Sequence, residues 1–533
     1  ESLIAPSSEH RAKMNLQPLP AWSSLPVWSQ RCQDGGSQVP LAISAALRVG
    51  EQLPSKSTSV SVLSAGGGCM LALYSGIGLP RQKRSTRCVA VRSSKATPDS
   101  DTSRHPSSSS SSMPSGNIVV DDSPVETDAM PDGLPKVHVK PWEWLSKAGM
   151  DESFRQDVEH EYCNVVEQPK ETVQGVIDRL TAAARECVAP SATAYPFGST
   201  VNGFGTVSSD LDVLIGVEEH DLYYYMSYVS WYHREQKWAR KRATRRVGVA
   251  DWPRVTTVRG RKAKSLAIEQ LEHCLPDHGF RVMQALPSAR KPLLTCADTE
   301  TALTEIDVSI NNRLPLHNSK LLKAYSELDH RVRPLVLMVK AWSKARGVCG
   351  AGQSNLSSYS WTIMSIYFMQ LAGMLPSLQK MVTDIFMIKD NDYWGDWREF
   401  DVMFMPAQEY KDKYGKQGVA EETQELTVAE LFYGFVYFFD QVYEWGKEKV
   451  SMRAPDRQEV NIYFRRFGSY EHHIDPLIHV EDPIEWRDLN VVLQRPDRLV
   501  ALKEEFHRAR QLLERGASLA ELTEKVDQAP EPW

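Results

Sequence analysis

Residues 197–215 read FGSTVNGFGTVSSDLDVLI, and this stretch decides the fold. Its Gly198-Ser199 pair is a small turn that lets backbone N–H groups approach a phosphate closely. Asp210 and Asp212 begin an apolar run that predicts a β-strand, in which residues two apart share a face. Two carboxylates on one face supply the hard oxygen ligands that Mg²⁺ prefers. The stretch therefore predicts a phosphate-binding turn followed by a metal-binding strand, the layout expected for nucleotidyl transfer.

A third acidic position lies farther along the chain, in the predicted strand from Glu305 to Ile310. The strand alternates apolar and polar residues, so Glu305 and Asp307 share one face. A third carboxylate on a neighbouring strand would bind a metal and help to deprotonate an attacking hydroxyl. The spacing alone does not choose between Glu305 and Asp307.

Composition divides the chain into four parts and predicts an α/β (α+β) fold. Residues 1–134 are rich in Ser, Pro and Gly and predict a disordered or targeting extension. An α/β domain with a basic insertion at about 231–265 is expected over 135–310, and a helical domain with a polar, irregular insertion at about 389–425 over 311–495. An amphipathic helix and tail are expected over 496–533. The predicted elements are helices within 151–187, interrupted at Pro169, strands at 193–197 and 211–217, and helices at 335–342, 359–368, 428–443 and 498–526.

The overall composition is that of an ordinary intracellular globular protein, with 42% hydrophobic residues and a net charge of −6. Eight scattered cysteines include no Cys-x-x-Cys pair, so neither a zinc site nor a disulfide framework is predicted. The apolar run at 69–79 is shorter than the ~20 residues of a membrane span, and we expect no membrane association. Residues 52–98 contain basic but no acidic residues. This leader is either an organelle transit peptide or an unstructured tail. If it is only a tail, a cytoplasmic location is expected.

Several motifs in order resemble those of terminal uridylyltransferases and non-canonical poly(A) polymerases, within the DNA polymerase β-type nucleotidyltransferases. The Gly198-Ser199…Asp210-Leu211-Asp212 motif with Asp307 resembles their catalytic palm. Residues 311–322 (NNRLPLHNSKLL) look like their sugar- and base-contacting segment, and residues 356–361 (LSSYSW) like their nucleotide-stacking segment. Residues 474–485 (IDPLIHVEDPIE) look like the end of their poly(A)-polymerase-associated domain. The resemblance covers about residues 135–495.

The resemblance implies a role for each matching residue and selects Asp307 over Glu305. Asp210, Asp212 and Asp307 would be the catalytic ligands of two Mg²⁺ or Mn²⁺ ions. The nucleotide would be bound by Gly198, Ser199, Asn312, Asn318, Lys340, Lys344, Ser358, Tyr359, Asp482, Glu485 and Asp488. Within this set Ser199, Lys340, Lys344 and Ser358 would contact phosphates, the two asparagines ribose and base edges, and Tyr359 would stack on the base.

The choice of nucleotide depends on Asp482 and Glu485. They match an acidic pair that reads uracil in the uridylyltransferases of this family, and Ile484 replaces a Phe between them. Carboxylate acceptors suit the uracil N3–H donor, whereas adenine presents an acceptor at that edge. Asp488 stands where many uridylyltransferases have a His. We therefore expect UTP, with ATP as the alternative.

The basic insertion is expected to contact RNA. Residues 234–264 contain twelve Lys or Arg and two acidic residues, with aromatic residues before and among them. Basic charge interleaved with aromatic rings suits phosphate tracking and base stacking. The predicted RNA-binding residues are Arg240, Lys241, Arg242, Arg245 and Arg246; the alternatives are a solvated charged helix and a disordered basic loop. A palm insertion of this kind also resembles those of mitochondrial RNA-editing uridylyltransferases, and together with the leader this resemblance implies a mitochondrial location.

Three readings of function remain open at this point. We expect a monomeric enzyme that adds UMP to RNA 3′ ends, and the runner-up is a poly(A) polymerase with the same fold. An inactive RNA-binding scaffold is the alternative of another class, and the intact set of three carboxylates argues against it.

Overall fold

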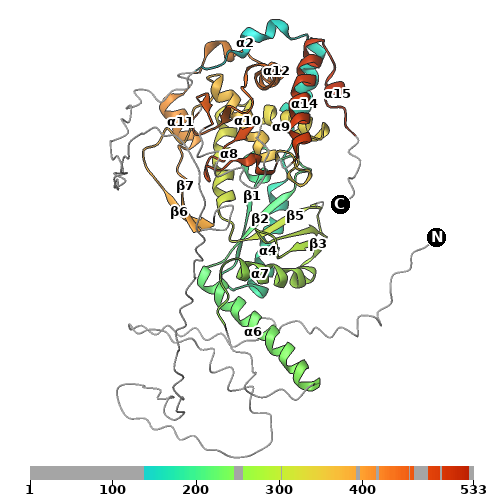
Figure 1. Ribbon diagram of the computed structural model, residues 1–533, viewed down its shortest axis with the longest axis vertical. Coiled ribbons are helices and arrows are strands. Elements are labelled where there is room, and N and C mark those ends of the chain that lie inside the picture. Colours follow the sequence, from blue (N-terminus) through green and yellow to red (C-terminus); the bar gives the residue numbers. More distant parts are fainter. Residues whose placement is uncertain are drawn as a thin grey trace, which may run out of the picture. The chain divides into compact units, whose positions relative to one another are not determined.

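The computed structural model describes residues 137–244, 256–301, 303–391, 397–415, 419–454, 456–460, 478–492 and 495–526 (Figure 1). For residues 241–244, 391, 491 and 492 it describes the backbone only. The expected N-terminal extension, residues 1–134, lies outside this part of the chain.

A five-stranded sheet forms the first half of the structure, in the order β1-β2-β5-β4-β3. Its strands are β1 (Thr193–Phe197), β2 (Leu211–Gly216), β3 (Phe280–Leu286), β4 (Leu293–Asp298) and β5 (Ile306–Ile310). β2 and β5 are parallel, and the other neighbours are antiparallel. The strands predicted at 193–197, 211–217 and 305–310 are confirmed to within one residue. β3 and β4 were not predicted: they lie within the long segment 218–300, whose basic cluster dominates its composition.

Helices α4 (Lys170–Cys187) and α7 (Gly260–Cys274) pack on this sheet and enclose one core with it. Val176, Ile177 and Leu180 follow the 3.6-residue period of a helix and are buried, which explains why α4 forms here. The long helix α6 (Glu219–Thr244) packs on α7 through its first half, where Leu222, Met226 and Val229 are buried. Figure 1 shows its second half extending away from the sheet.

A helical part follows the sheet and has its own core. It contains α8 (Leu314–Leu328), α9 (Val332–Ala345), α10 (Ser358–Leu371) and α12 (Val428–Tyr437), with α2 (Pro141–Trp144) and α3 (Glu152–Val158) from the start of the described chain. Every residue of α10 from Ser360 to Leu371 is buried. A helix that is apolar on all sides belongs in the centre of a domain, and α10 lies there. The predicted helices at 335–342, 359–368 and 428–443 are confirmed.

The segment 389–425 corrects the prediction, because much of it is regular. It contains most of a hairpin formed by β6 (Met387–Asn391) and β7 (Trp397–Asp401), and helix α11 (Ala407–Tyr414). The polar sequence misled the prediction because an exposed hairpin can keep polar residues on its solvent side.

The last part of the described chain packs back onto the helical core. Strands β8 (Glu448–Val450), β9 (Gln458–Glu459) and β10 (His479–Val480) form a small sheet. The predicted C-terminal helix is present as α14 (Pro496–Glu514) and a short α15 (Leu519–Leu522). Phe506 of α14 packs among Trp342, Trp361 and Phe439. None of the helices in the described ranges is both long and apolar enough to cross a membrane.

Shorter helical turns connect these elements. A four-residue helix, α5 (Ser199–Asn202), follows β1, and 3₁₀ or π turns occupy Leu145–Lys147, Glu159–Cys163, Leu275–His278, Ala351–Gln353, Glu421–Thr423, Phe438–Val442 and Leu489–Val492.

Candidate active site

Three carboxylates meet on the central strands of the sheet. The parallel register of β2 and β5 places Asp212 directly beside Asp307, and Asp210 lies one residue before β2. Burial, with the charges of Asp307 and Asp210, raises the pKa of Asp212 to about 7. Burial and Asp210 also raise the pKa of Asp307. The strand order thus concentrates negative charge at one position of the sheet.

Asp307, rather than Glu305, has the geometry of a metal ligand. Its Oδ1 accepts a 2.6 Å hydrogen bond from the Thr295 hydroxyl on β4, which orients the carboxylate. Glu305 lies before β5 with an exposed side chain, although the charge of Asp210 raises its pKa. Thr295 was missed by the sequence analysis, because only the β4–β5 register brings it opposite Asp307.

The predicted phosphate-binding turn packs directly against Asp212. Gly198 has φ +71°, and a Cβ atom added there would lie 2.0 Å from Asp212 Oδ2. Only glycine allows this approach without strain. The Gly198 N–H donates a 2.8 Å hydrogen bond to the Ser319 hydroxyl of α8. The turn that begins α5 at Ser199 is therefore fixed both to the acidic strand and to the helical part.

Lys340 of α9 reaches this turn. Its Nζ donates a 2.9 Å hydrogen bond to the Phe204 carbonyl, while Lys344, one turn later, is exposed. Burial and the charge of Lys344 lower the pKa of Lys340 to about 8. The positive charge of Lys340 also opposes the rise in the pKa of Asp212. Both lysines lie where they could neutralise phosphates held at the turn.

The chemistry of the donor set fits divalent cations. In the described chain no Lys, Arg or His forms a salt bridge with Asp210, Asp212 or Asp307, so their mutual repulsion is only weakly opposed. A hard cation supplies the missing positive charge and takes carboxylate oxygens as its preferred ligands. The three aspartates could hold Mg²⁺ or Mn²⁺.

The predicted ribose-contacting segment leads from β5 into α8. The Asn312 side chain accepts a 3.1 Å hydrogen bond from Lys291 Nζ, and Asn318 Oδ1 is buried without a hydrogen-bond partner in the described chain. A buried acceptor without a partner is costly unless a ligand satisfies it. Asn311, which the prediction did not single out, connects the ends of β2 and β5. Its Oδ1 accepts a 2.7 Å hydrogen bond from the Val217 N–H, and its Nδ2 donates a 2.8 Å hydrogen bond to the Val217 carbonyl.

The predicted base-contacting residues also converge. Tyr359 is the second residue of α10, directly after Ser358, and its hydroxyl is buried while part of the side chain stays accessible. Burial and the nearby carboxylate of Asp482 raise its pKa. Asp482 Oδ1 accepts hydrogen bonds from the Ile484 and Glu485 N–H groups, at 2.9 and 2.8 Å. The acidic pair therefore lies beside the predicted stacking residue.

Asp488 does not have the geometry expected of a base-contacting residue. Its side chain is 1% exposed, and Oδ2 lies 2.6 Å from His479 Nδ1. Oδ1 accepts hydrogen bonds from the Val480 and Asn490 N–H groups, at 3.2 and 3.0 Å. We therefore correct the expectation: both oxygens of Asp488 are used to fasten β10 to the turn that follows.

The β6–β7 hairpin, which the sequence analysis missed, joins the two segments that are predicted to contact the nucleotide. Phe400 lies in β7 and Val402 follows this strand. Both residues share a small core with Leu314 of α8 and with Ile484, which lies between Asp482 and Glu485. Asp390, 3% exposed, accepts a 2.8 Å hydrogen bond from the Arg313 N–H at the start of α8. Ile484, which replaces a Phe of the family motif, thus contacts the hairpin.

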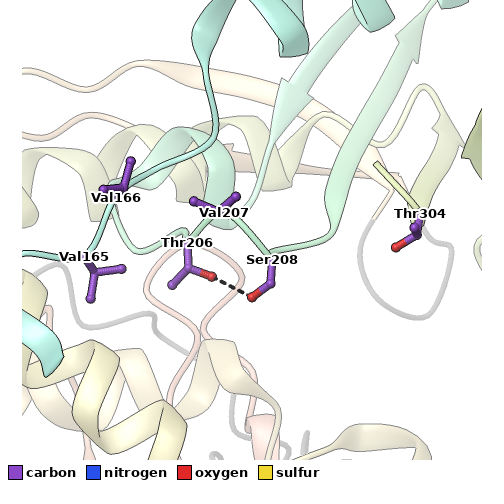
Figure 2. Close-up of a pocket in the computed structure, with 6 residues that line it drawn as sticks. All are labelled: Val165, Val166, Thr206, Val207, Ser208 and Thr304. Atoms are coloured by element: carbon purple, nitrogen blue, oxygen red, sulfur yellow. Dashed lines mark hydrogen bonds between the residues drawn. The ribbon is translucent and has the colours of Figure 1, made fainter. Parts of the chain in front are cut away.

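A cavity of about 480 Å³ opens beside the acidic strands (Figure 2). It is lined by Thr206, Val207 and Ser208 before β2, by Thr304 before β5, and by Val165 and Val166. Figure 2 shows the hydrogen bond between the Thr206 and Ser208 hydroxyls at 3.1 Å. No predicted site residue lines it, but it adjoins the ends of β2 and β5 at which Asp210 lies.

The predicted RNA-binding residues are only partly within the described chain. Arg240 is an exposed residue of α6; the backbone of Lys241 and Arg242 continues that helix, but their side chains lie outside the described residues, as Arg245 and Arg246 do entirely. Tyr224 and Tyr228 are 44% and 40% exposed on the same helix, and Lys237 is exposed between them and Arg240.

Comparisons with known proteins identify similar RNA polymerases and transferases. Residues 156–327 match the family described as poly(A) RNA polymerase, mitochondrial-like, central palm domain. The chain is 29% identical to Poly(A) RNA polymerase gld-2 of Caenorhabditis elegans over 306 residues, covering 56% of this chain and 23% of that protein. It is 26% identical to human Terminal uridylyltransferase 7 over 297 residues, covering 54% of this chain and 16% of that protein.

Solved structures show the same fold. The Cid1 poly(U) polymerase superposes with a TM-score of 0.51 at 21% identity, covering 70% of this chain and 99% of the Cid1 chain. The polymerase β-type nucleotidyltransferase fold and the family resemblance predicted from the sequence are thereby confirmed.

Proposed function

We propose that this chain, which is similar to terminal uridylyltransferases and poly(A) RNA polymerases, adds ribonucleotides from UTP to RNA 3′ ends without a template. The observation that carries the proposal is the β2–β5 register, which places Asp212 beside Asp307 and next to Asp210. The matched stretches cover less than a quarter of the gld-2 and Terminal uridylyltransferase 7 proteins, so the activity of this chain rests on its own site.

Each residue of the candidate site has a proposed role in the reaction. An RNA 3′-hydroxyl attacks the α-phosphate in line, and pyrophosphate leaves. Gly198 and Ser199 hold the triphosphate against β2, and Lys340 and Lys344 neutralise its outer phosphates. Divalent cations, when bound to the three aspartates, would stabilise the attacking and leaving oxygens. Asn312 and Asn318 position the ribose, Ser358 adds a phosphate contact, and Tyr359 stacks on the base.

Uracil is proposed because the base site is acidic. Asp482 and Glu485 lie beside Tyr359 and provide acceptors for the uracil N3–H donor. Adenine would present its N1 acceptor to a carboxylate, which leaves both groups unpaired and costs about 1–3 kcal/mol. Adenylyl transfer remains the second candidate, because the chain is also similar to proteins named poly(A) polymerases.

One assay tests both parts of the proposal. Purified protein is incubated with labelled RNA and each of the four NTPs separately, with Mg²⁺ or Mn²⁺. We expect extension with UTP, and none by the Asp210→Ala/Asp212→Ala variant. Preferential extension with ATP would reject the uridylyl assignment, and equal extension by the double variant would reject the active site.

We also propose that α6 guides the RNA, on the basis of its exposed cations and tyrosines. Replacing Lys237 and Arg240 by Gln should weaken RNA binding and flatten its salt dependence, because fewer counterions are released. Lys411→Gln/Lys413→Gln on the exposed face of α11 is the charge-matched control. Equal salt slopes for all three proteins would contradict this role.

For location we propose mitochondria, because residues 52–98 include basic residues and no acidic ones. Residues 1–134 fused to a fluorescent protein should enter mitochondria. A fusion that stays in the cytosol would reject this part of the proposal and leave the catalytic assignment untouched.

A further inference from the structure

Three side chains of types that can ligate a metal lie together at the C-terminal ends of α4 and α7, and none of them belongs to the aspartate site. Glu186 is the second-last residue of α4, Cys274 the last residue of α7, and His278 ends the 3₁₀ turn that follows α7. One ligand atom from each residue lies within 4.8 Å of the other two. His278 Nε2 and Glu186 Oε2 are already 3.1 Å apart.

The donor types suit zinc rather than magnesium. A thiolate and an imidazole are ligands that Mg²⁺ rarely takes, whereas Zn²⁺ binds Cys, His and carboxylate side chains at about 2.0–2.3 Å in a tetrahedron. Such bonds place ligand atoms ~3.3–3.8 Å from one another, so these three side chains need only a small inward adjustment. Glu186 is exposed, and solvent can supply a fourth ligand.

Cys274 would ligate the cation through its sulfur. Cys274 itself lies 3.7 Å from the Ala183 carbonyl, to which it donates its S–H. On metal binding this proton would pass to solvent, and the sulfur would turn to the cation.

We propose that Glu186, Cys274 and His278 form a second metal site, which binds a zinc-class cation and ties the end of α4 to the end of α7. Both helices pack on the sheet that carries Asp212 and Asp307. A cation that joins the ends of these helices would therefore stabilise the packing of the palm domain. The site uses none of the proposed catalytic or nucleotide-binding residues, and it stands whether or not the chain is a uridylyltransferase.

Cobalt titration tests the site without relying on activity. The full chain carrying Asp210→Ala/Asp212→Ala, which removes two catalytic ligands, is titrated with CoCl₂ under reducing conditions. We expect a thiolate-to-cobalt charge-transfer absorption that saturates near one equivalent and is abolished by added ZnCl₂. Zinc should also raise the melting temperature by a few degrees, because it binds only the folded chain.

Matched variants separate metal binding from a plain ion pair. Cys274→Ser should remove the charge-transfer band, and His278→Gln should weaken zinc binding by about 100-fold or more, since each loses a ligand. Cys163→Ser is the control, because Cys163 also donates to a glutamate, Glu159, at 3.0 Å but belongs to no such group in the described chain. An absent band in the parent protein, or a band that survives Cys274→Ser, would show that Glu186 and His278 form only an ion pair.

Discussion

Two groups of acidic residues in this protein are held in opposite ways. The palm aspartates Asp210, Asp212 and Asp307 lie close together, with the single hydroxyl of Thr295 and the nearby Lys340 as their recorded protein partners. The acidic residues at 481–488 are instead paired one by one. Glu481 is bound by Lys449 and Ser451, Asp482 by two backbone N–H groups, Glu485 by Arg487, and Asp488 by His479 and two backbone N–H groups.

The difference indicates what each group does. Paired carboxylates gain enough from their hydrogen bonds to fix the loop that carries them. Carboxylates left to repel one another destabilise the metal-free protein and become favourable when a cation binds. The palm therefore has the properties of a catalytic metal site, and the 481–488 segment those of a rigid frame around Asp482 and Glu485, the residues that we propose read the base.

Asp212→Asn should have the largest effect. It removes a proposed metal ligand, so nucleotide addition should fall by at least about 10³-fold, while the metal-free protein melts at the same temperature or higher because repulsion is relieved. Activity and melting curves measure the two changes. Glu305→Gln, an exposed acidic residue beside the site, is the control and should stay near wild type. A comparable loss in Glu305→Gln would mean that the third ligand was wrongly assigned.

The second largest effect should be a pH dependence of stability that arises from the palm aspartates. Asp212 has a pKa of about 7 against an ordinary value of 3.8. Between these values the folded state binds more protons than the unfolded state, so metal-free stability should fall as pH rises from about 4 to 7, by a few kcal/mol at most. Mg²⁺ should stabilise the protein more at pH 8 than at pH 6. Denaturation at each pH measures this, and a wild-type slope in Asp212→Asn would contradict it.

Asp488→Asn should act on stability and leave nucleotide choice unchanged. It weakens a buried hydrogen bond to His479, so we expect a loss of about 1–3 kcal/mol in the free energy of unfolding. The exposed Asp497→Asn, next to Arg495, is the control and should change less than about 0.5 kcal/mol. The UTP-to-ATP activity ratio should remain that of the wild type. A shifted ratio at unchanged stability would restore Asp488 as a base-reading residue.

Asp390→Asn should have the smallest effect of these four predictions. It removes only the charge of Asp390, whose carboxylate is already hydrogen-bonded to the Arg313 N–H. Its carboxylate orients the start of α8, so we expect KM for the nucleotide to rise up to about fivefold, about 1 kcal/mol, with kcat nearly unchanged. Steady-state kinetics measures both constants, with the exposed Asp384→Asn as the control. A fall in kcat at constant KM would place Asp390 closer to the chemistry than the hairpin allows.

The sequence predicted the elements whose pattern is local. The apolar runs of β2, α9 and α10 and the alternation of apolar and polar residues in β5 revealed these elements, because the pattern of apolar residues indicates which face is buried. It missed β3, β4 and the β6–β7 hairpin, where charged and polar composition masked the alternation. Asp488 was misjudged for a related reason: its place in the motif is local, but its partner His479 is set by how β10 meets the following turn.

By itself the sequence determined the chemistry of this protein: the glycine turn, the three aspartates and the order of the motifs, because residue type and short spacing fix which groups share a strand or helix face. Only the tertiary structure decided which groups meet across elements. The strand order placed Asp307 and Thr295 beside Asp212, the hairpin joined Leu314 to Ile484, and the ends of two helices brought Cys274 and His278 to Glu186. These contacts depend on packing between residues up to about 170 positions apart, which no local pattern records.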